Sequence, residues 1–318
     1  MTVKISLKHE TGFLVQPLTA ITFPAGEVHV RGFDTVNPDN YNYAIIDARF
    51  SAESLNTDVL TIRAVVDSMA DNGWENLPIY LLLPYLPGAR ADRGVPFGAN
   101  LYGKFIAEGD FSHIIILDPH SAVMPELMSN GHSRRYVIEV PFERIIRKEI
   151  QDASSDTRPQ TYDGVIAPDA GAVKRATRAA RVMGVPVYRA GKTRDFATGA
   201  LTGFHMEDKL PTTGKFLLVD DICDGGGTFR GLAQAIKRTH PMVELDLWVT
   251  HGIFSNETTL KLMLEQNFTT IHTTNSFDGL SQYGLPVKRR IEVGLIKIHD
   301  ITPYMYNEAH HYDESFQL

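Results

Sequence analysis

One stretch, residues 217–229, constrains this chain more than any other. It reads LLVDDICDGGGTF, in which an apolar run is followed by two adjacent carboxylates, a third carboxylate, three glycines and a threonine. A short apolar run bounded by turn residues is typical of a buried parallel strand. Apolar residues then recur at the spacing of one helix face. The pattern therefore predicts a strand, a tight loop and a helix.

The composition of this loop indicates a ligand that is both an anion and a sugar. Glycine lets the backbone adopt positive φ and lets a ligand come close, and the free N–H groups at a helix start favour an anion. The residues expected to cradle a phosphate are Gly225, Gly226, Gly227 and Thr228. Asp220 and Asp221 add acceptors for sugar hydroxyls, or outer ligands for Mg²⁺. Together these residues predict a sugar-phosphate site.

Two other nucleotide-binding motifs do not fit the chain. The dinucleotide pattern G-x-G-x-x-G requires glycine where Arg230 stands, and a Walker A loop ending at Lys192 requires glycine where Pro186 stands. The remaining possibility is an ordinary strand–turn–helix with solvated aspartates. Three acids and three glycines within eight residues are hard to accommodate without a ligand.

Composition limits the classes of protein that the chain can belong to. Its 318 residues, 43% hydrophobic and 22% charged, are those of a globular protein with room for two domains. The net charge of −7 leaves no large basic surface for nucleic acid. The single Cys223 excludes an intrachain disulfide and fits a reducing compartment. No apolar run approaches ~18 residues, so we expect a cytoplasmic protein without a membrane partner.

Strand and helix patterns alternate along both halves of the chain. In the first half a hairpin or small meander is expected at 13–31, strands at 43–47, 78–84, 113–118 and 136–140, and helices at 59–69, 100–108 and 143–150. In the second half strands are expected at 164–169, 185–188, 201–204, 215–219, 243–249, 269–273 and 295–298, and helices at 173–183 and 257–266. A basic loop is expected at 189–195, and a linker or junction loop at 151–160. The alternation predicts two α/β domains with parallel sheets.

Further charged residues follow predicted strands. Arg90 and Arg93 are two guanidiniums at a strand end, where open α/β sheets bind ligands, and arginine suits phosphate. They could equally form a surface pair bridged by Asp92. His120 also follows a strand; it could be a metal ligand, a base or a capping group, and taken alone it fits a structural or capping role best. Asp118 beside it strengthens the case for a divalent ion.

The 217–229 stretch resembles the ribose 5-phosphate/PRPP loop of type I phosphoribosyltransferases and of ribose-phosphate diphosphokinases (PRPP synthetases). Other segments resemble motifs of the diphosphokinases in the same order. FPAGE at 23–27 is similar to F-S-D-G-E, PYLPGARADR at 84–93 to P-Y-x-x-Y-A-R-Q-D-R, LDPHS at 117–121 to L-D-L-H-A, PDAGA at 168–172 to P-D-x-G-G, KTR at 192–194 to K-R-R, TH at 250–251 to T-H-P, and TNS at 274–276 to T-N-S. The resemblance therefore covers the whole chain.

This resemblance implies two type I phosphoribosyltransferase-like α/β domains. The first would span 1–148, joined by 300–318, on the ATP side, and the second 149–299 with the sugar-phosphate loop. The implied reaction is Mg²⁺-dependent transfer of the diphosphoryl group of ATP to the 1-hydroxyl of ribose 5-phosphate, giving PRPP and AMP. The implied assembly is a homo-oligomer, a dimer or hexamer.

The resemblance also implies roles for individual residues. The ATP site would comprise Glu27, Arg90, Asp92 and Arg93, with Glu27 donated by a neighbouring subunit. His120 and Asp169 would hold Mg²⁺, while Lys192 and Arg194 would close over the reacting phosphates and act with His120 in catalysis. Asp220, Asp221 and 224–228 would hold ribose 5-phosphate.

The chain departs from the family pattern at positions that bear on its substrates. Ala25 and Ala91 replace an Asp and a Gln at the adenine end of the ATP site. The loop DGGGTF replaces the commoner D-T-A-G-T, which widens the cradle and suggests a larger acceptor such as ADP-ribose, for NAD salvage. Two competing hypotheses are a base phosphoribosyltransferase and a catalytically silent, synthetase-associated regulatory subunit.

Overall fold

The computed structural model describes residues 3–9, 11–12, 14–129, 136–151, 161–194 and 201–315. The chain divides into two compact units, which are described separately. Unit 1 comprises Met1–Val140 and Thr302–Leu318, and unit 2 comprises Pro141–Ile301. Residue 13 of the predicted meander, the junction loop at 152–160, residues 195–200 and the side chain of Arg194 lie outside the described part.

Unit 1 is built on a six-stranded sheet in the order β2-β1-β5-β7-β8-β9. The strands are β1 (Val3–His9), β2 (Leu14–Val15), β5 (Tyr41–Ala48), β7 (Ile79–Leu83), β8 (His113–Leu117) and β9 (Tyr136–Val140). The strands from β5 to β9 are parallel, while β1 is antiparallel to both of its neighbours. Every residue of β7 and β8 is buried, as in parallel strands that are covered on both faces.

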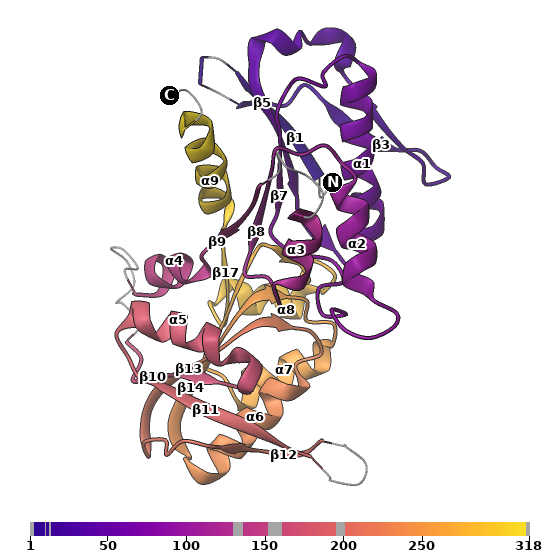
Figure 1. The fold of residues 1–318 in the computed structure, drawn as a ribbon. Coiled ribbons are helices and arrows are strands. Elements are labelled where there is room, and N and C mark those ends of the chain that lie inside the picture. The colour runs from indigo at the N-terminus through magenta and orange to yellow at the C-terminus, as the bar shows by residue number, and fades with distance from the viewer. Residues whose placement is uncertain are drawn as a thin grey trace. The chain divides into compact units, whose positions relative to one another are not determined.

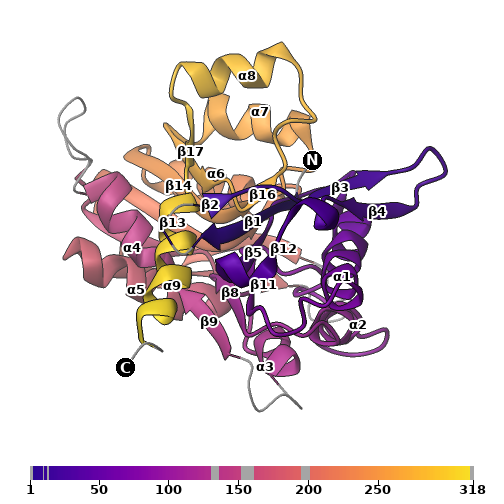
Figure 2. The ribbon, with the colours of Figure 1, turned by 90° about the horizontal axis from the view of Figure 1, so that it is seen from above.

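Helices cover both faces of this sheet. They are α1 (Leu55–Asp71), α2 (Gly98–Ala107), α3 (Val123–Ser129) and the C-terminal α9 (Thr302–Ser315). Helix α9 contacts β7, β8 and β9, and α1 contacts β1 and β5. Figures 1 and 2 show α9 on one face and α1 with α2 on the other. A hydrogen bond between the Tyr43 hydroxyl and the His310 ring attaches α9 to β5.

The segment before β5 forms a hairpin, in part as its sequence predicts. Strands β3 (Thr19–Thr22) and β4 (Val28–Arg31) pair with each other, while β2 pairs with β1 instead. The turn at 23–27 is closed by Phe23 N–H to Glu27 O at 2.8 Å and Gly26 N–H to Phe23 O at 2.8 Å. The tip of this hairpin extends away from the unit 1 sheet in Figure 1. A short strand, β6 (Phe50–Ser51), follows β5.

Unit 2 is built on a seven-stranded sheet in the order β12-β11-β10-β13-β14-β15-β17. The strands are β10 (Gly164–Ala167), β11 (Val187–Arg194), β12 (Leu201–Met206), β13 (Thr213–Cys223), β14 (Met242–Gly252), β15 (Ile271–Thr274) and β17 (Ile296–His299). All neighbours are parallel except β11 and β12. The loop predicted to begin at residue 189 is wrong as far as Arg194, because β11 continues there and pairs with β12.

The helices of unit 2 also lie on both faces of its sheet. They are α4 (Phe142–Ile146), followed by a π-helical turn at Arg147–Gln151, α5 (Val173–Met183), α6 (Gly227–Thr239), α7 (Glu257–Gln266) and α8 (Leu285–Glu292). Helix α5 contacts β10, β11 and β13, whereas α6 contacts β12, β14 and α7. Figure 1 shows α5 and α6 on opposite faces. A short strand, β16 (Phe277–Asp278), follows β15.

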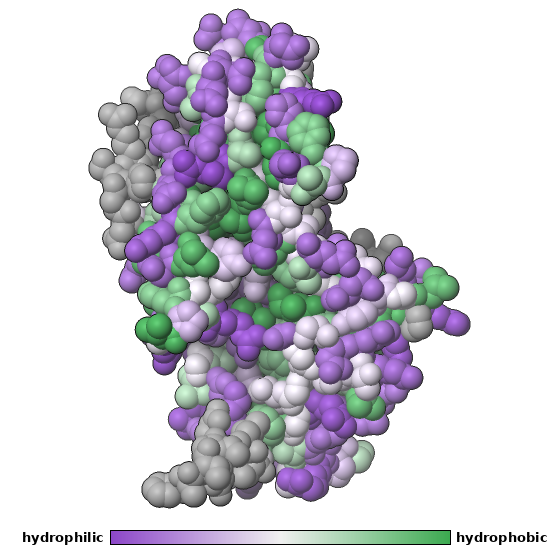
Figure 3. All heavy atoms as spheres, turned by 90° about the vertical axis from the view of Figure 1, so that its right-hand side faces the viewer, coloured by the Kyte–Doolittle hydropathy of each residue, from purple (hydrophilic) through white to green (hydrophobic). Residues whose placement is uncertain are grey.

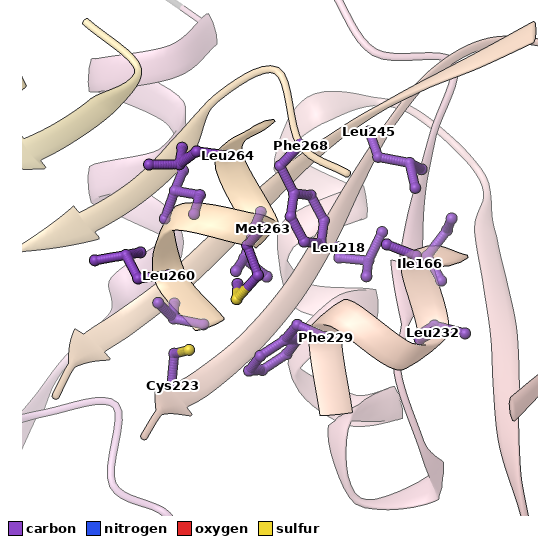
Figure 4. Packing of buried hydrophobic residues seen from close by; sticks show 14 of the residues in the cluster. Ile166, Leu218, Cys223, Phe229, Leu232, Leu245, Leu260, Met263, Leu264 and Phe268 are labelled. Carbon is purple, nitrogen blue, oxygen red and sulfur yellow. The ribbon is translucent and has the colours of Figure 1, made fainter. Parts of the chain in front are cut away.

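A hydrophobic cluster lies beneath the start of α6. Figure 4 shows Phe229 and Leu232 of α6 with Met263 of α7 and Leu218 of β13. Leu218, Leu232 and Met263 are fully buried, and Phe229 is 4% exposed. Burying a side chain of this size contributes roughly 1.5–3 kcal/mol. The loop between β13 and α6 is therefore held on a packed base.

Among the described residues, no helix has the length and apolar character needed to cross a membrane. Figure 3 shows hydrophilic side chains over much of one face, with smaller hydrophobic areas between them.

Candidate functional site

The acidic residues predicted for unit 2 gather at one edge of its sheet. Asp169 follows the end of β10, and Asp220 and Asp221 stand near the end of β13. The two strands are parallel neighbours, with Ile166 opposite Leu218. Their carboxyl ends therefore meet at the edge where open α/β sheets bind ligands.

Both carboxylates of the 220–221 pair contact one arginine. Arg175 Nη1 lies 3.4 Å from Asp220 Oδ1, and its Nη2 lies 3.7 Å from Asp221 Oδ2. The three side chains are 12%, 18% and 5% exposed, respectively. Arg175 stands in the first turn of α5, and this helix packs on β13. The pair is thus a partly buried charge cluster rather than two solvated aspartates.

The pKa of one acid in this pair is strongly shifted. Burial, together with the neighbouring charge of Asp221, raises the pKa of Asp220 to about 8, although Arg175 acts in the opposite direction. Two adjacent carboxylates repel each other when both are ionised and removed from water. Hydroxyl donors or a cation would relieve that repulsion, so the pair is suited to a polyhydroxylated or metal-bearing ligand.

The glycine loop turns sharply at one position. Gly226 has φ of +76° and immediately precedes α6. A Cβ there would lie 2.6 Å from Met263 Sδ and 3.1 Å from Thr259 Cγ2. The fold therefore requires glycine at this position, both for its conformation and for the close approach of α7.

The other two glycines of the loop face open space. A Cβ at Gly227 would meet nothing within 4 Å, and one at Gly225 would only reach Ser255 Oγ at 4.0 Å. Neither residue has positive φ. Asp224 Oδ1 accepts a hydrogen bond of 2.5 Å from Ser255 Oγ, which holds the loop in place. The first N–H groups of α6 have no helical partner, so the open side offers donors to an anion.

A second ion pair lies at this sheet edge. Lys192 Nζ is 2.6 Å from Asp169 Oδ2, and Oδ1 of Asp169 accepts hydrogen bonds from Gly171 N–H at 3.0 Å and Ala172 N–H at 3.2 Å. Burial acts to raise the pKa of Asp169, but Lys192 and the two N–H groups outweigh it and hold that pKa below its ordinary value. Asp169 is thus an ionised carboxylate that caps the turn at Ala170–Ala172.

The residues predicted for unit 1 lie on loops after β7 and β8, with one exception. Arg90, Asp92 and Arg93 follow β7, and His120 follows β8. These strands are parallel neighbours with Leu83 opposite Ile116, so both loops leave the same edge of the unit 1 sheet. Glu27 is the exception, because it lies exposed in the β3–β4 turn.

Asp92 contacts one of the two arginines of this loop. Asp92 Oδ1 lies 3.5 Å from Arg93 Nε, with Asp92 8% and Arg93 91% exposed. The bridge through Asp92 that the sequence allowed therefore exists on the Arg93 side. Arg90 is exposed at the end of a turn in which Ala91 N–H bonds Gly88 O at 2.9 Å. Both arginines are exposed residues.

Comparisons with known proteins support one family. The family model described as phosphoribosyl transferase domain matches residues 136–251. Ribose-phosphate pyrophosphokinase from Maricaulis maris is 24% identical over 253 residues, which is 77% of this chain and 76% of that protein. Ribose-phosphate pyrophosphokinase from Cereibacter sphaeroides is 25% identical over 207 residues, 63% of this chain but only 57% of that protein.

The fold agrees over nearly the whole chain with one solved structure. Phosphoribosylpyrophosphate synthetase from Mycobacterium smegmatis superposes with a TM-score of 0.70 at 20% identity, covering 94% of this chain and 90% of that one. In sequence and fold the chain resembles the ribose-phosphate diphosphokinases, at 20–25% identity. The predicted α/β fold with type I phosphoribosyltransferase-like sheets is confirmed.

Two of the family-like motifs meet in a buried hydrogen-bond network of unit 2. His251 Nδ1 lies 2.8 Å from Ser276 Oγ, and the Thr274 hydroxyl donates to Thr250 O at 2.7 Å. All four residues are at most 3% exposed. The network joins the carboxyl ends of β14 and β15, next to β13, where His251 is opposite Ile222. These motifs therefore stabilise the sheet edge beside the acidic pair.

The donor set of unit 2 fits a hard divalent cation. Asp169, Asp220 and Asp221 supply carboxylate oxygens, which Mg²⁺ prefers, usually together with waters and substrate phosphates. Among the described residues, no group of three or more His, Cys, Asp or Glu side chains forms a ready-made metal cage. His120 belongs to unit 1 and Asp169 to unit 2, so their joint role as Mg²⁺ ligands stays a prediction.

Arg175 was not predicted from the sequence. Helical periodicity placed Ala176 and Ala180 on the buried face of this segment and gave no reason to single out the arginine. Its position six residues after Asp169 was the available signal, because the first turn of a helix that follows β10 lies beside the end of β13. Only the packing of α5 shows which carboxylates it contacts.

Proposed function

We propose that this chain transfers the diphosphoryl group of ATP to the 1-hydroxyl of ribose 5-phosphate, giving PRPP and AMP. One observation carries the proposal: the Asp220–Asp221 pair stands at a sheet edge directly before the Gly226 turn that opens α6. That arrangement offers acceptors for sugar hydroxyls and donors for a phosphate a few residues apart. The names of the curated relatives support the same reaction.

The acceptor would lie along the end of β13. Asp220 and Asp221 would accept hydrogen bonds from the ribose hydroxyls, and the 224–228 loop would hold the 5-phosphate with its N–H groups and the Thr228 hydroxyl. The helix dipole of α6 favours the anion at that place. The rigid base under Phe229 fixes the orientation of the sugar, so its 1-hydroxyl has a defined direction.

The chemical step requires positioning and charge neutralisation more than covalent work by the protein. The 1-hydroxyl oxygen forms a bond to the β-phosphorus of ATP, the bond from that phosphorus to the α,β-bridging oxygen breaks, and AMP leaves. Lys192 and Arg194 would neutralise the transferred phosphates. Mg²⁺, held by Asp169 and His120, would supply further charge neutralisation when bound. The hydroxyl proton passes to solvent water as the new bond forms.

The ATP site would lie in the predicted first domain, 1–148 with 300–318, and the acceptor site in the second, 149–299. Arg90 and Arg93 are exposed on the loop after β7 and suit the phosphates of ATP. The exposed place of Glu27 on the β3–β4 turn fits its proposed contribution to a neighbouring subunit's ATP site, within a homo-oligomer.

A larger acceptor is the second candidate, and the glycine loop favours it. The fold requires glycine only at position 226, whereas Gly225 and Gly227 face space that a side chain could fill. Leaving that space open would allow a ribose 5-phosphoester such as ADP-ribose to extend its diphosphate past the loop. The reaction would be the same, with ADP-ribose in place of ribose 5-phosphate.

AMP release tests both candidates directly. Purified protein with ATP and Mg²⁺ is given ribose 5-phosphate, ADP-ribose or no acceptor, and AMP is quantified by chromatography. Acceptor-dependent AMP is the expected result, and the ratio of kcat/KM values identifies the acceptor. Absence of AMP with either acceptor would contradict the proposal and favour the silent regulatory subunit, which the presence of Lys192 and Asp169 argues against.

A base phosphoribosyltransferase makes a different prediction. It would consume PRPP together with a nucleobase and release diphosphate, without any need for ATP. The same preparation incubated with PRPP and each common nucleobase should therefore release no diphosphate.

A further inference from the structure

Arg175 is the cation that faces the acidic pair from within the described part of unit 2. Its guanidinium reaches Asp220 Oδ1 at 3.4 Å and Asp221 Oδ2 at 3.7 Å, and its side chain is only 12% exposed. Because the guanidinium is planar and carries its donors in a rigid fork, two adjacent carboxylates can be held by one group. A lysine at this place would offer a single point of charge.

The local backbone makes the position of Arg175 precise. Asp169 caps the turn at Ala170–Ala172, and α5 begins at the next residue, Val173. Helical backbone therefore continues from the residue after Asp169, whose carboxylate is paired with Lys192, to Arg175. The same short segment, 169–175, contacts both the proposed acceptor site and the residue proposed to neutralise the transferred phosphates.

An arginine with a purely structural role makes different contacts, as the neighbouring arginine of α5 does. Arg178 Nη2 lies 2.8 Å from Glu143 Oε2, and its guanidinium stacks over Phe142, 5.0 Å from the ring centroid. Those contacts join α5 to α4. Arg175 instead contacts the two carboxylates that have a proposed ligand, and it opposes the repulsion between them.

We propose that Arg175 is a positioning residue for the acceptor: it holds the side chains of Asp220 and Asp221 in the orientation that accepts the ribose hydroxyls. This inference rests on the proposed function of the same site. Without the guanidinium, the two acidic side chains would be free to rotate apart, and binding of the sugar would then have to reorient them. The cost falls on acceptor binding and leaves ATP binding in unit 1 unaffected.

The test compares R175M and R175K with R178M, which removes the matched arginine of the same helix. Binding of ribose 5-phosphate, and of ADP-ribose in parallel, is measured by calorimetry without ATP or metal, together with KM for acceptor and for ATP and the melting temperature. R175M should weaken acceptor binding about 10-fold or more, as expected for loss of charge-assisted contacts. Its KM for ATP should stay within about twofold, since ATP lies elsewhere. R175K should recover part of the acceptor affinity.

The control and the contrary outcomes separate this inference from the proposed function. R178M should lower the melting temperature and leave acceptor affinity unchanged. If R175M lowers only the melting temperature and binds acceptor like the unaltered protein, Arg175 is structural and the inference is wrong, while the proposed function stands. If R175M does not fold, R175K decides, and acceptor affinity equal to that of the unaltered protein overturns the inference. If the unaltered protein binds neither acceptor, both proposals are overturned.

Discussion

Lys192 Nζ lies 2.6 Å from Asp169 Oδ2, so the lysine proposed for catalysis is paired with the acid proposed to bind Mg²⁺. Their side chains are 24% and 32% exposed, which leaves the pair accessible to a ligand. Exposed ion pairs contribute little to folding, typically below about 1 kcal/mol. A metal ion that approaches Asp169 would compete with Lys192 and release its ammonium group towards the transferred phosphates.

Replacing Lys192 by Met should therefore damage turnover far more than binding. We expect kcat for AMP release to fall by about 10²–10³-fold, the magnitude seen when a transition-state donor is removed. KM for acceptor should change by less than about threefold, because the ammonium group acts mainly in the transition state. Steady-state kinetics with varied acceptor and ATP measure both quantities.

The matched control is K209M, which removes an exposed lysine after β12. It should leave kcat and KM unchanged. A K192M variant with unaltered kcat would show that Lys192 only caps Asp169 and takes no part in the transfer.

The three glycines of the loop should differ sharply in their tolerance of a side chain. G226A forces an alanine into φ of +76° and brings its Cβ to 2.6 Å from Met263 Sδ. Strain and overpacking of this kind cost roughly 1–3 kcal/mol each. G227A meets nothing within 4 Å and should leave the free energy of unfolding nearly unchanged. Urea unfolding of the two variants measures the contrast.

G227A also tests whether the open space beside Gly227 holds the diphosphate of a larger acceptor. If a diphosphate passes there, KM for ADP-ribose should rise while KM for ribose 5-phosphate changes little. Equal kinetics with ADP-ribose before and after the change would count against the larger acceptor.

A buried network in the unit 2 sheet should matter for stability alone. Asp246 is fully buried; it accepts from the Tyr162 hydroxyl at 2.6 Å and from Thr270 N–H at 2.9 Å, and Lys215 Nζ lies 2.8 Å away. Removing one partner of a buried ion pair costs about 3–5 kcal/mol. Lys215 is 22% exposed and can reach water. The free energy of unfolding should therefore fall by an amount near the lower end of this range in D246N, about 3 kcal/mol.

Kinetics distinguish this effect from one on the site. Lys215 stands near the start of β13, and Asp246 of β14 is opposite Leu217, three residues before Asp220. D246N should therefore lower the free energy of unfolding in urea while the folded protein keeps its KM for acceptor. A large rise in that KM would contradict the assignment of this network to stability.

Unit 2 should lose stability in mild acid because of a stacked histidine pair. The rings of His272 and His299 are 5.3 Å apart, and Trp248 lies against them. Burial lowers the pKa of His299 to about 4, despite the opposing charge of Glu149, and burial lowers the pKa of His272 as well. The folded state therefore binds fewer protons than the unfolded state, whose histidines titrate near 6.5.

The direction of the pH dependence of stability follows from that difference in bound protons. The stabilisation is complete above about pH 6.5 and is lost as pH falls towards 4, by about 1.4 kcal/mol per pH unit for each extra proton bound on unfolding. Urea unfolding from pH 7 to 5 measures the slope. H299F, which retains a ring against Trp248, should flatten it, whereas H240A at the C-terminal end of α6 should not. An unchanged slope in H299F would show that other groups control the acid response.

Local patterns predicted the elements around the site with good accuracy. The helix expected at 257–266 is α7, and the strand expected at 136–140 is β9. Long periodic or apolar runs encode such elements locally, because burial on one face or both faces leaves a spacing in the sequence. The segment at 189–194 was mispredicted because polar residues in an antiparallel extension have no apolar alternation, and its partner β12 supplies the backbone hydrogen bonds.

The sequence by itself pointed to the proposed acceptor loop, since the order of acids, glycines and threonine carries its chemistry in adjacent residues. It also determined the α/β class, through the alternation of two periodicities. Only the tertiary structure decided which glycine the backbone requires, which residue pairs with Asp169 and which cation stands over Asp220 and Asp221. Those relationships join residues 23 to 46 positions apart, and they exist because parallel strands bring their carboxyl ends to one edge.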